Sequence, residues 1–309
     1  MNASAAPPNP DRPPRHGLAA ALAAYVAWGC FPLYFKSIRS VPPLQILSHR
    51  VVWSLLFLAL LVSWKRRWPE LRGIFADGQL PTYLLTTLLI SANWLIFIWA
   101  VNGGRVLEAS LGYFVNPLVN VLLGVLFLRE RLSRKQGAAV ALAGLGVLAL
   151  VIRLGVFPWV SLALALSFGF YGLVRKKARI DAVVGLLVET ALLAPVALAF
   201  LLLVEAQGQG AFVHQGLPTT LLLASAGIVT AVPLIWFATG MKTLRLSTMG
   251  VVQFITPTAQ FLQAVLLFRE PFTMSHGIAF GCIWASLALY TFDAVRTRHP
   301  SQPAEPALD

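Results

Sequence analysis

Polar side chains inside long apolar stretches are the residues of this sequence that could do chemistry. Two trios lie 140 positions apart, and spacings of three and four put each trio on one face of a helix: Tyr113, Asn116 and Asn120, and Gln253, Thr256 and Gln260. Polar groups in hydrocarbon must be paired or hydrated, so two matching faces predict a shared cavity for a polar solute. Interhelical hydrogen bonding for packing is the alternative.

Three ionisable residues that lie more than a turn inside apolar stretches are also candidates: His49, Arg50 and Glu189. His49 and Glu189 are 140 positions apart, and either could carry a coupling proton, because both residue types can exchange a proton near neutral pH in a suitable environment. Their depths in the membrane would differ by roughly 10–15 Å, so we expect no direct bond between them. Arg50 would either bind an anionic group of a solute or extend its charge to the lipid headgroups.

Other side chains could line the same cavity or shape it. We name as candidates Trp28, Asn93, Trp94, Tyr171 and Trp236. For a single aromatic residue, helix packing or a place in the interfacial aromatic belt is the alternative to solute contact. Pro117 and Pro257 fall in mid-stretch, where proline permits a kink, and the kink would either shape the cavity or be static.

Motifs of hydrolases, metal sites and nucleotide-binding proteins are missing. The sequence contains no HExxH, GxSxG, CxxC or GxxxxGK[ST] pattern. We therefore expect no catalytic residue, no metal site and no cofactor, and an ATP-driven pump is excluded. Cys30 and Cys282 each lie in an apolar stretch and are predicted to be small packing residues.

An internal repeat positions these candidates. Between Arg105 and Ala139, an ungapped overlay on the segment 140 residues later gives ten identities in 35 positions. The identities include the Arg129-Glu130 pair, which matches Arg269-Glu270. The same offset pairs Gly29 with Gly169, and a duplication across almost the whole chain is predicted.

Composition gives the class of protein. Of the 309 residues, 58% are hydrophobic and only 12% are charged, whereas about a quarter of residues are charged in soluble domains. Apolar runs of membrane-spanning length are predicted as ten helices, at 17–37, 44–64, 80–101, 107–128, 135–152, 157–173, 183–204, 218–240, 246–268 and 273–292. The chain is thus predicted to be an all-α polytopic membrane protein, with the lipid bilayer and a small-molecule solute as its partners.

The basic residues predict the orientation. Of the 24 Lys and Arg residues, 18 fall on one side of the membrane and five on the other, and Arg50 lies within a span. The positive-inside rule places both termini in the cytoplasm. This distribution also accounts for the net charge of +12 without a nucleic-acid partner.

Five spans per repeat invert the second copy relative to the first. We expect a polar cytoplasmic tail at 1–16, a first five-helix half at 17–152, an inverted second half at 157–292 and a second cytoplasmic tail at 293–309. Inverted halves are the architecture of alternating-access transporters, with the solute site between them near the midplane. Small residues in spans 5 and 10, Gly137, Gly277 and Gly281 among them, would pack the halves together or form a homodimer seam.

A family resemblance is carried by residues 24–36, 46–54, 93–102, 109–132 and 230–272. These stretches resemble the RarD-type permeases, which belong to the EamA family of the drug/metabolite transporter superfamily and are often labelled chloramphenicol-sensitive proteins. The resemblance implies two inverted EamA repeats in the bacterial inner membrane around a central cavity. The positions that match the family's motifs are His49, Arg50, Asn93, Trp94, Tyr113, Asn116, Pro117, Gln253 and Pro257.

These observations predict an inner-membrane secondary transporter of a small polar or amphipathic solute. Spans 1–4 and 6–9 would enclose the cavity, and spans 5 and 10 would be peripheral. A passive channel or a non-transporting membrane scaffold is the alternative, and a continuous wet pore in one static structure would favour the channel. An intramembrane enzyme would need a nucleophile, base and acid within reach of one another, and Ser48-His49 alone does not supply them.

Overall fold

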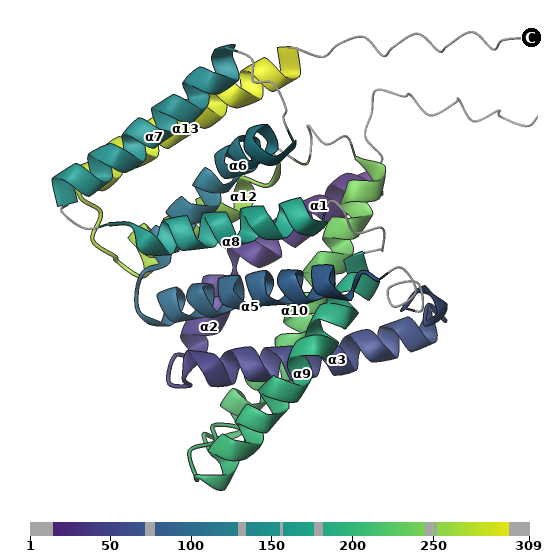
Figure 1. The fold of residues 1–309 in the computed structure, drawn as a ribbon. Coiled ribbons are helices and arrows are strands. Elements are labelled where there is room, and N and C mark those ends of the chain that lie inside the picture. The colour runs from purple at the N-terminus through teal and green to yellow at the C-terminus, as the bar shows by residue number, and fades with distance from the viewer. Residues whose placement is uncertain are drawn as a thin grey trace, which may run out of the picture.

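The protein is α-helical throughout the part that the computed structural model describes, namely residues 15–71, 78–128, 134–154, 157–175, 182–244, 249 and 252–296. Its main helices are α1 (Arg15–Gly29), α2 (Phe31–Ser37), α3 (Pro43–Trp64), α5 (Leu80–Asn102), α6 (Val106–Leu128), α7 (Arg134–Leu154), α8 (Trp159–Arg175), α9 (Ala182–Ala206), α10 (Leu217–Thr243), α12 (Ile255–Leu262), the π-helix η1 (Gln263–Leu267) and α13 (Met274–Arg296). In Figure 1, α3, α5 and α8 run side by side, and α7 and α13 pair at one edge. We refer to the two ends of the bundle as the Pro43 end and the Trp64 end, after the first and last residues of α3.

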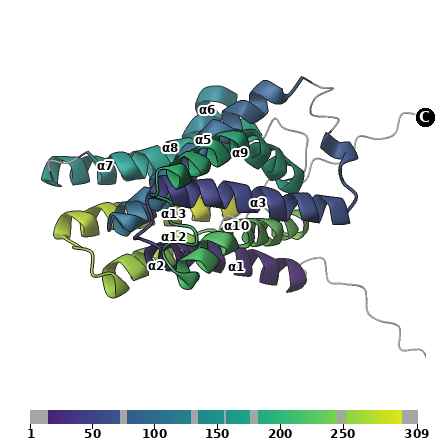
Figure 2. The ribbon, with the colours of Figure 1, turned by 90° about the horizontal axis from the view of Figure 1, so that it is seen from below.

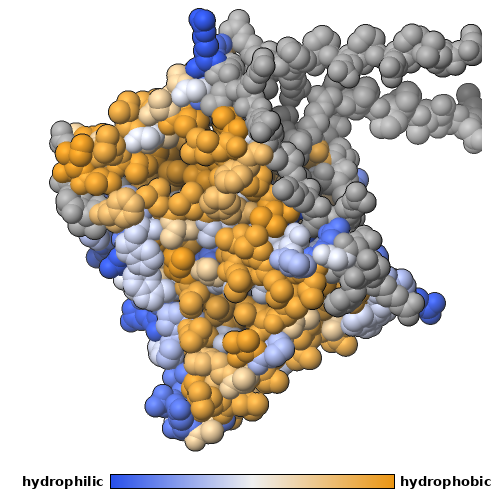
Figure 3. All heavy atoms as spheres, viewed as in Figure 1, coloured by the Kyte–Doolittle hydropathy of each residue, from blue (hydrophilic) through white to orange (hydrophobic). Residues whose placement is uncertain are grey.

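The chain is a polytopic membrane protein. Among the described residues, seven helical stretches are long and apolar enough to cross a membrane. Two shorter apolar helices span Trp159–Arg175 and Ile255–Leu267, and the remaining predicted span corresponds to α7. Large apolar side chains cover the face seen in Figure 3, and exposed ones include Leu88, Phe168, Val196 and Leu202. A surface of this kind belongs in lipid rather than in water.

Each predicted span overlaps a described helix, and two of them contain a turn, at Cys30 and at 253–254. The first is divided at Cys30 into α1 and α2. Pro32 explains this break, because proline has no N–H to donate to the carbonyl of Trp28 one turn earlier. Gln260 Nε2 donates to that carbonyl instead, at 3.2 Å. The ninth span is described from residue 252, and its residues 246–248 and 250–251 lie outside the described part.

Helices packed in one half have counterparts packed in the other. α6 packs on α8 as α12 packs on α1, α5 packs on α8 as α10 packs on α1, and α3 packs on α10 as α9 packs on α5. Three further contacts join a helix to its own counterpart: α3 with α9, α6 with α12, and α7 with α13. In Figure 2, α3 lies between α9 on one side and α10 and α1 on the other. Exchanging each helix for the one 140 residues away leaves these contacts unchanged.

Two glycine contacts repeat this relation at the level of single atoms. A Cβ on Gly29 would lie 2.8 Å from the Cβ of Ala259, and a Cβ on Gly169 would lie 2.9 Å from Cγ1 of Val119. Gly169 lies 140 positions after Gly29, and Val119 lies 140 positions before Ala259, so the two contacts are equivalent in the repeat. Glycine is needed at both places because the facing helix approaches too closely for a side chain.

The paired helices α7 and α13 lie beside the rest of the bundle and, of the other helices, contact mainly α6. Their closest approach is at Gly146, where a Cβ would lie 2.7 Å from the Cβ of Cys282. Ser286 Oγ also donates to the carbonyl of Ala139, at 2.5 Å. Among the described atoms, none lies within 4 Å of a Cβ built on Gly137 or Gly281. The close contact is therefore not made through these two glycines.

The N-terminus of α6 is held by a carboxylate of the other half. Glu270 accepts hydrogen bonds from the backbone amides of Val106, at 2.9 Å, and Leu107, at 2.8 Å. These amides have no partner within the helix, and the positive end of the helix dipole favours an anion there. Burial raises the pKa of Glu270, while the two amide bonds and nearby Lys36 act in the opposite direction.

Candidate functional site

Arg50 lies in the interior, near the middle of the bundle, and is only 5% exposed. Its Nε donates to Thr230 Oγ1 in α10, at 2.8 Å. The guanidinium carbon lies 4.1 Å from the ring centroid of Trp94 in α5 and 5.7 and 5.8 Å from those of Phe31 and Phe35 in α2. The side chain does not extend to the lipid headgroups, which was one of the two predicted alternatives. Side chains from both halves of the chain therefore surround this cation.

No carboxylate in the described part of the chain balances the charge of Arg50. Within the described residues, no carboxylate lies within ion-pair distance of its guanidinium. A desolvated cation–π contact contributes about 2 kcal/mol, whereas burying an unpaired ion costs several kcal/mol. The aromatic rings offset only part of that cost.

His49 lies beside Arg50 in sequence but faces a different space. It lines a cleft of about 380 Å³ at the Pro43 end, bounded by α3, the end of α9 and the segment that joins α9 to α10. The ring of Phe212, from that segment, stacks on the imidazole with 5.0 Å between centroids. Gln45, one turn before His49, holds the segment by donating to the carbonyl of Gln209 and accepting from the amide of Ala211, both at 3.0 Å.

The rim of this cleft carries the charges of the joining segment. His214 Nε2 lies 2.5 Å from Oε1 of Glu205, and both side chains are largely exposed. Phe212 also contacts Trp53, with 5.9 Å between ring centroids. The ring of Phe212, which belongs to the second half, thus covers the cleft. Gln45 of the first half holds the segment that carries this ring.

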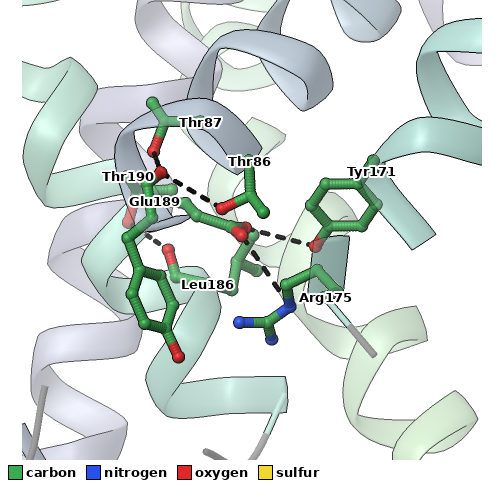
Figure 4. A network of polar contacts seen from close by, with 8 residues as sticks. Thr86, Thr87, Tyr171, Arg175, Leu186, Glu189 and Thr190 are labelled. Atoms are coloured by element: carbon green, nitrogen blue, oxygen red, sulfur yellow. Dashed lines mark hydrogen bonds and ion pairs between the residues drawn. The ribbon is translucent and has the colours of Figure 1, made fainter. Parts of the chain in front are cut away.

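A second polar cluster lies toward the Trp64 end, between α5, α8 and α9 (Figure 4). Glu189 is 2% exposed. Its Oε2 accepts a hydrogen bond from the Tyr171 hydroxyl at 3.2 Å, and its Oε1 lies 3.8 Å from Nε of Arg175. The Arg175 guanidinium packs directly against Gly185, where a Cβ would collide with it, and lies over the ring of Tyr83.

This cluster is incompletely bonded. Three of its buried atoms form no hydrogen bond with the described part of the protein: Arg175 Nη1, Glu189 Oε1 and the Tyr83 hydroxyl. Buried polar atoms in native proteins are almost always bonded. As predicted, Glu189 does not contact His49, since the two belong to clusters near opposite ends of the bundle.

The predicted polar face of α6 remains together in the structure. Asn120 Nδ2 donates to Asn116 Oδ1 at 2.8 Å, and Nδ2 of Asn116 is buried without a partner among the described residues. Tyr113 lies close enough to Arg50 for electrostatic interaction and packs against Phe97, with 5.7 Å between ring centroids.

The matching face of the second half serves mainly to hold helices together. Thr256 donates to the carbonyl of Tyr25 at 2.7 Å, and Gln260 donates to that of Trp28. Both bonds join α12 to α1 and represent the packing alternative. Gln253 lies half-buried in the turn before α12.

The remaining candidates separate into different environments. Asn93 donates to the carbonyl of Leu164 at 3.1 Å and to Ser167 at 2.9 Å, which joins α5 to α8. The ring of Trp28 packs against Tyr25 and Phe237, and Trp236 is 39% exposed on α10. Of the candidate aromatics, Trp94 is the one over the Arg50 guanidinium, and Tyr171 bonds Glu189.

The two predicted kink prolines occupy different positions in their helices. Pro117 lies inside α6, which continues as a helix to Leu128. Pro257 lies in the first turn of α12 rather than in mid-helix, where proline disrupts no intrahelical bond. The kink predicted at Pro257 stays a prediction, since residues 250–251 of this span lie outside the described part and a turn at 253–254 precedes α12. A π-helix follows α12.

Several residues of these clusters were missed in the sequence: Gln45, Tyr83, Arg175, Phe212 and Thr230. Gln45 lies one helical turn before His49, so helix periodicity could have indicated that Gln45 belongs to the same cluster. Gly185 lies one turn before Glu189 in the same way. Arg175 lies two residues beyond the span predicted at 157–173 and was therefore not expected within the membrane. Phe212 and Thr230 carried no signal, because only the fold brings them to α3.

Comparisons with known proteins agree with this picture. The model of the EamA-like transporter family matches residues 15–152. The chain is 48% identical to an uncharacterized transporter of Pseudomonas aeruginosa, over 94% of this chain and 98% of that protein. It is 46% identical to Protein RarD of Escherichia coli, over 92% and 96% of the two chains. It is also 44% identical to the uncharacterized transporter YojE of Bacillus subtilis, over 90% and 94%.

A solved crystal structure is similar in fold. It superposes with a TM-score of 0.58 over 92% of this chain and 99% of that chain, at 20% sequence identity. At this identity the similarity concerns the fold alone.

Proposed function

We propose that this chain, which belongs to the EamA-like transporter family and within it to the RarD-type permeases, moves a small polar or amphipathic solute across the bacterial inner membrane by alternating access. It would do so as a secondary transporter with ten spans, both termini in the cytoplasm, and two inverted halves at 17–152 and 157–292. We assign it no catalytic role.

The observation that carries this proposal is the position of Arg50. A buried cation from the first half bonds Thr230 of the second half, and no carboxylate of the described residues pairs with it. Ionisable groups inside a membrane protein usually mark the path of a substrate or ion. The repeated helix contacts support a site between two equivalent halves, which is where inverted-repeat transporters bind their solutes.

The two polar clusters support alternating access rather than a fixed pore. The cleft at His49 is covered by Phe212 near the Pro43 end, and the Arg175–Glu189 pair lies toward the Trp64 end. In each cluster one contact joins the two halves and would change if they rocked: Phe212 on His49 in the first cluster, and Arg175 over the ring of Tyr83 in the second. We propose that the clusters act as the two gates, and that His49 or Glu189 carries the coupling proton.

Accessibility labelling can test this mechanism without knowledge of the solute. Thr230→Cys would be made in a background in which Cys30 and Cys282 are replaced by serine. A membrane-impermeant maleimide should label Thr230→Cys in right-side-out vesicles and also in inside-out vesicles. Planar bilayers containing the same protein should show no unitary currents.

Two results would contradict the mechanism. Labelling from one side only, under every condition tried, would indicate a scaffold or a locked protein. Steady unitary currents would indicate a channel. Leu22→Cys, on the exposed face of α1, would be the matched control for nonspecific labelling.

A further inference from the structure

The guanidinium of Arg50 identifies the chemical class of the solute. We infer that it binds the carboxylate, or an equivalent anionic group, of a solute whose apolar body packs against the aromatic rings of α2 and α5. This inference rests on the proposed transport function and adds the substrate class to it.

Arg50 has donors that the described part of the protein leaves free. A guanidinium carries five N–H donors in a fixed planar fork. Among the described residues, its one hydrogen-bond partner is Thr230, which uses the Nε donor. The donors on the two terminal nitrogens therefore remain for a ligand. Two parallel N–H groups match the two oxygens of a carboxylate, which a neutral group cannot replace.

The other buried charges of the described residues each have an oppositely charged or hydrogen-bonding partner within the protein. Arg175 has Glu189 as its partner, at 3.8 Å. The Glu270 carboxylate has two backbone amides. Arg50 differs because it has aromatic rings around it and no anion. A membrane protein that retained such a residue for packing alone could replace it with an apolar side chain of similar volume.

The surroundings of Arg50 indicate the shape of the rest of the solute. Trp94, Phe31 and Phe35 lie around the guanidinium, and Tyr113 adds a hydroxyl nearby. These rings favour an apolar, preferably aromatic, body next to the anionic group. The rings belong to the first half and Thr230 to the second, so a bound anion would contact the junction whose movement transport requires.

Binding to the purified protein tests the inference. Radiolabelled benzoate is the probe, and benzamide, which has the same shape without the charge, is the competitor. We expect saturable benzoate binding to wild-type protein that benzamide does not displace. Arg50→Met should lose at least about tenfold in affinity, the usual effect of removing a charge-assisted pair. Arg39→Met, which replaces an exposed arginine just before the Pro43 end of α3, should bind as the wild type does.

Two further variants keep the test decisive if Arg50→Met folds poorly. Arg50→Lys retains the charge but loses the fork, so benzoate should bind several-fold more weakly. Thr230→Val leaves the charge in place but frees Nε and unseats the guanidinium, so a smaller loss is expected. Size-exclusion profiles and melting temperatures establish that each variant is folded.

The outcomes are separate from those of the transport proposal. Unchanged benzoate affinity in folded Arg50→Met protein would overturn the inference, and so would the failure of wild-type protein to bind benzoate, phenylacetate, hexanoate or phenylphosphonate. Two-sided labelling at Thr230→Cys together with such a failure would leave a transporter of another solute class. Binding of benzoate to a protein labelled from one side only would leave an anion site without transport.

Discussion

Arg175 and Glu189 form a buried ion pair, and because the pair is buried we expect the coupling energy between the two side chains to be larger than for an exposed pair. Their atoms lie 3.8 Å apart, and the side chains are 14% and 1% exposed. At an effective dielectric constant near 20, two unit charges at this distance attract by about 4 kcal/mol. Removing one member of a buried pair leaves the other uncompensated, which costs about 3–5 kcal/mol.

A double-mutant cycle measures this coupling. Arg175→Met and Glu189→Gln would be made singly and together, and the free energy of unfolding would be measured by denaturing-detergent titration in mixed micelles. We expect each single change to cost about 3 kcal/mol. The double mutant should lose less than the sum, with a coupling energy of about 2–4 kcal/mol, because it leaves no buried charge alone.

The chain provides a matched control for this cycle. Arg105 Nη1 and Glu108 Oε1 also lie 3.8 Å apart, but these side chains are 43% and 33% exposed. Exposed pairs contribute about 0–1 kcal/mol, so Arg105→Met and Glu108→Gln should show little coupling. Equal coupling energies in the two cycles would refute the reasoning, since they would show that the Glu189 cluster is as well hydrated as the surface.

Three further predictions concern the segment over the cleft and the junction between the halves. Gln45→Leu removes both hydrogen bonds to the segment that covers the cleft, a net loss of about 2 kcal/mol. Amide hydrogen exchange at Ala211 should therefore become at least about tenfold faster. Unchanged exchange would show that Gln45 does not hold the segment. Glu270→Ala leaves two amides at the N-terminus of α6 without a partner and should lower the free energy of unfolding by about 2 kcal/mol. A change below about 0.5 kcal/mol, the size expected of a neutral surface substitution, would argue against this cap. Gly29→Val and Gly169→Val should both lower the melting temperature substantially, and a loss confined to one of them would contradict the equivalence of the two contacts.

The sequence alone determined the class of protein and the positions of its helices. Apolar runs of membrane length are visible directly, because every segment in the hydrocarbon must bury its own backbone polar groups in a helix. Predicted and observed bounds therefore differ by only a few residues across α3, α5, α6 and α9. The repeat was also readable, since the Gly29 and Gly169 contacts follow the 140-residue offset found in the sequence.

The roles of individual polar residues were decided by the tertiary structure. His49 and Arg50 are neighbours in sequence, but a helix turns by about 100° per residue, so one faces the cleft and the other faces the aromatic rings. Asn93 and Gln260 looked like cavity residues and instead bond the backbone of facing helices. An amide serves either use equally well, and what it does depends on which helix lies opposite.

The same reason explains why the partners of the charged residues could not be predicted. Thr230 is 180 positions from Arg50, and Phe212 is 163 from His49. No spacing within a single helix encodes such contacts. Sequence periodicity determines what a helix buries, whereas the packing of α3 against α9 and α10 determines which polar groups meet.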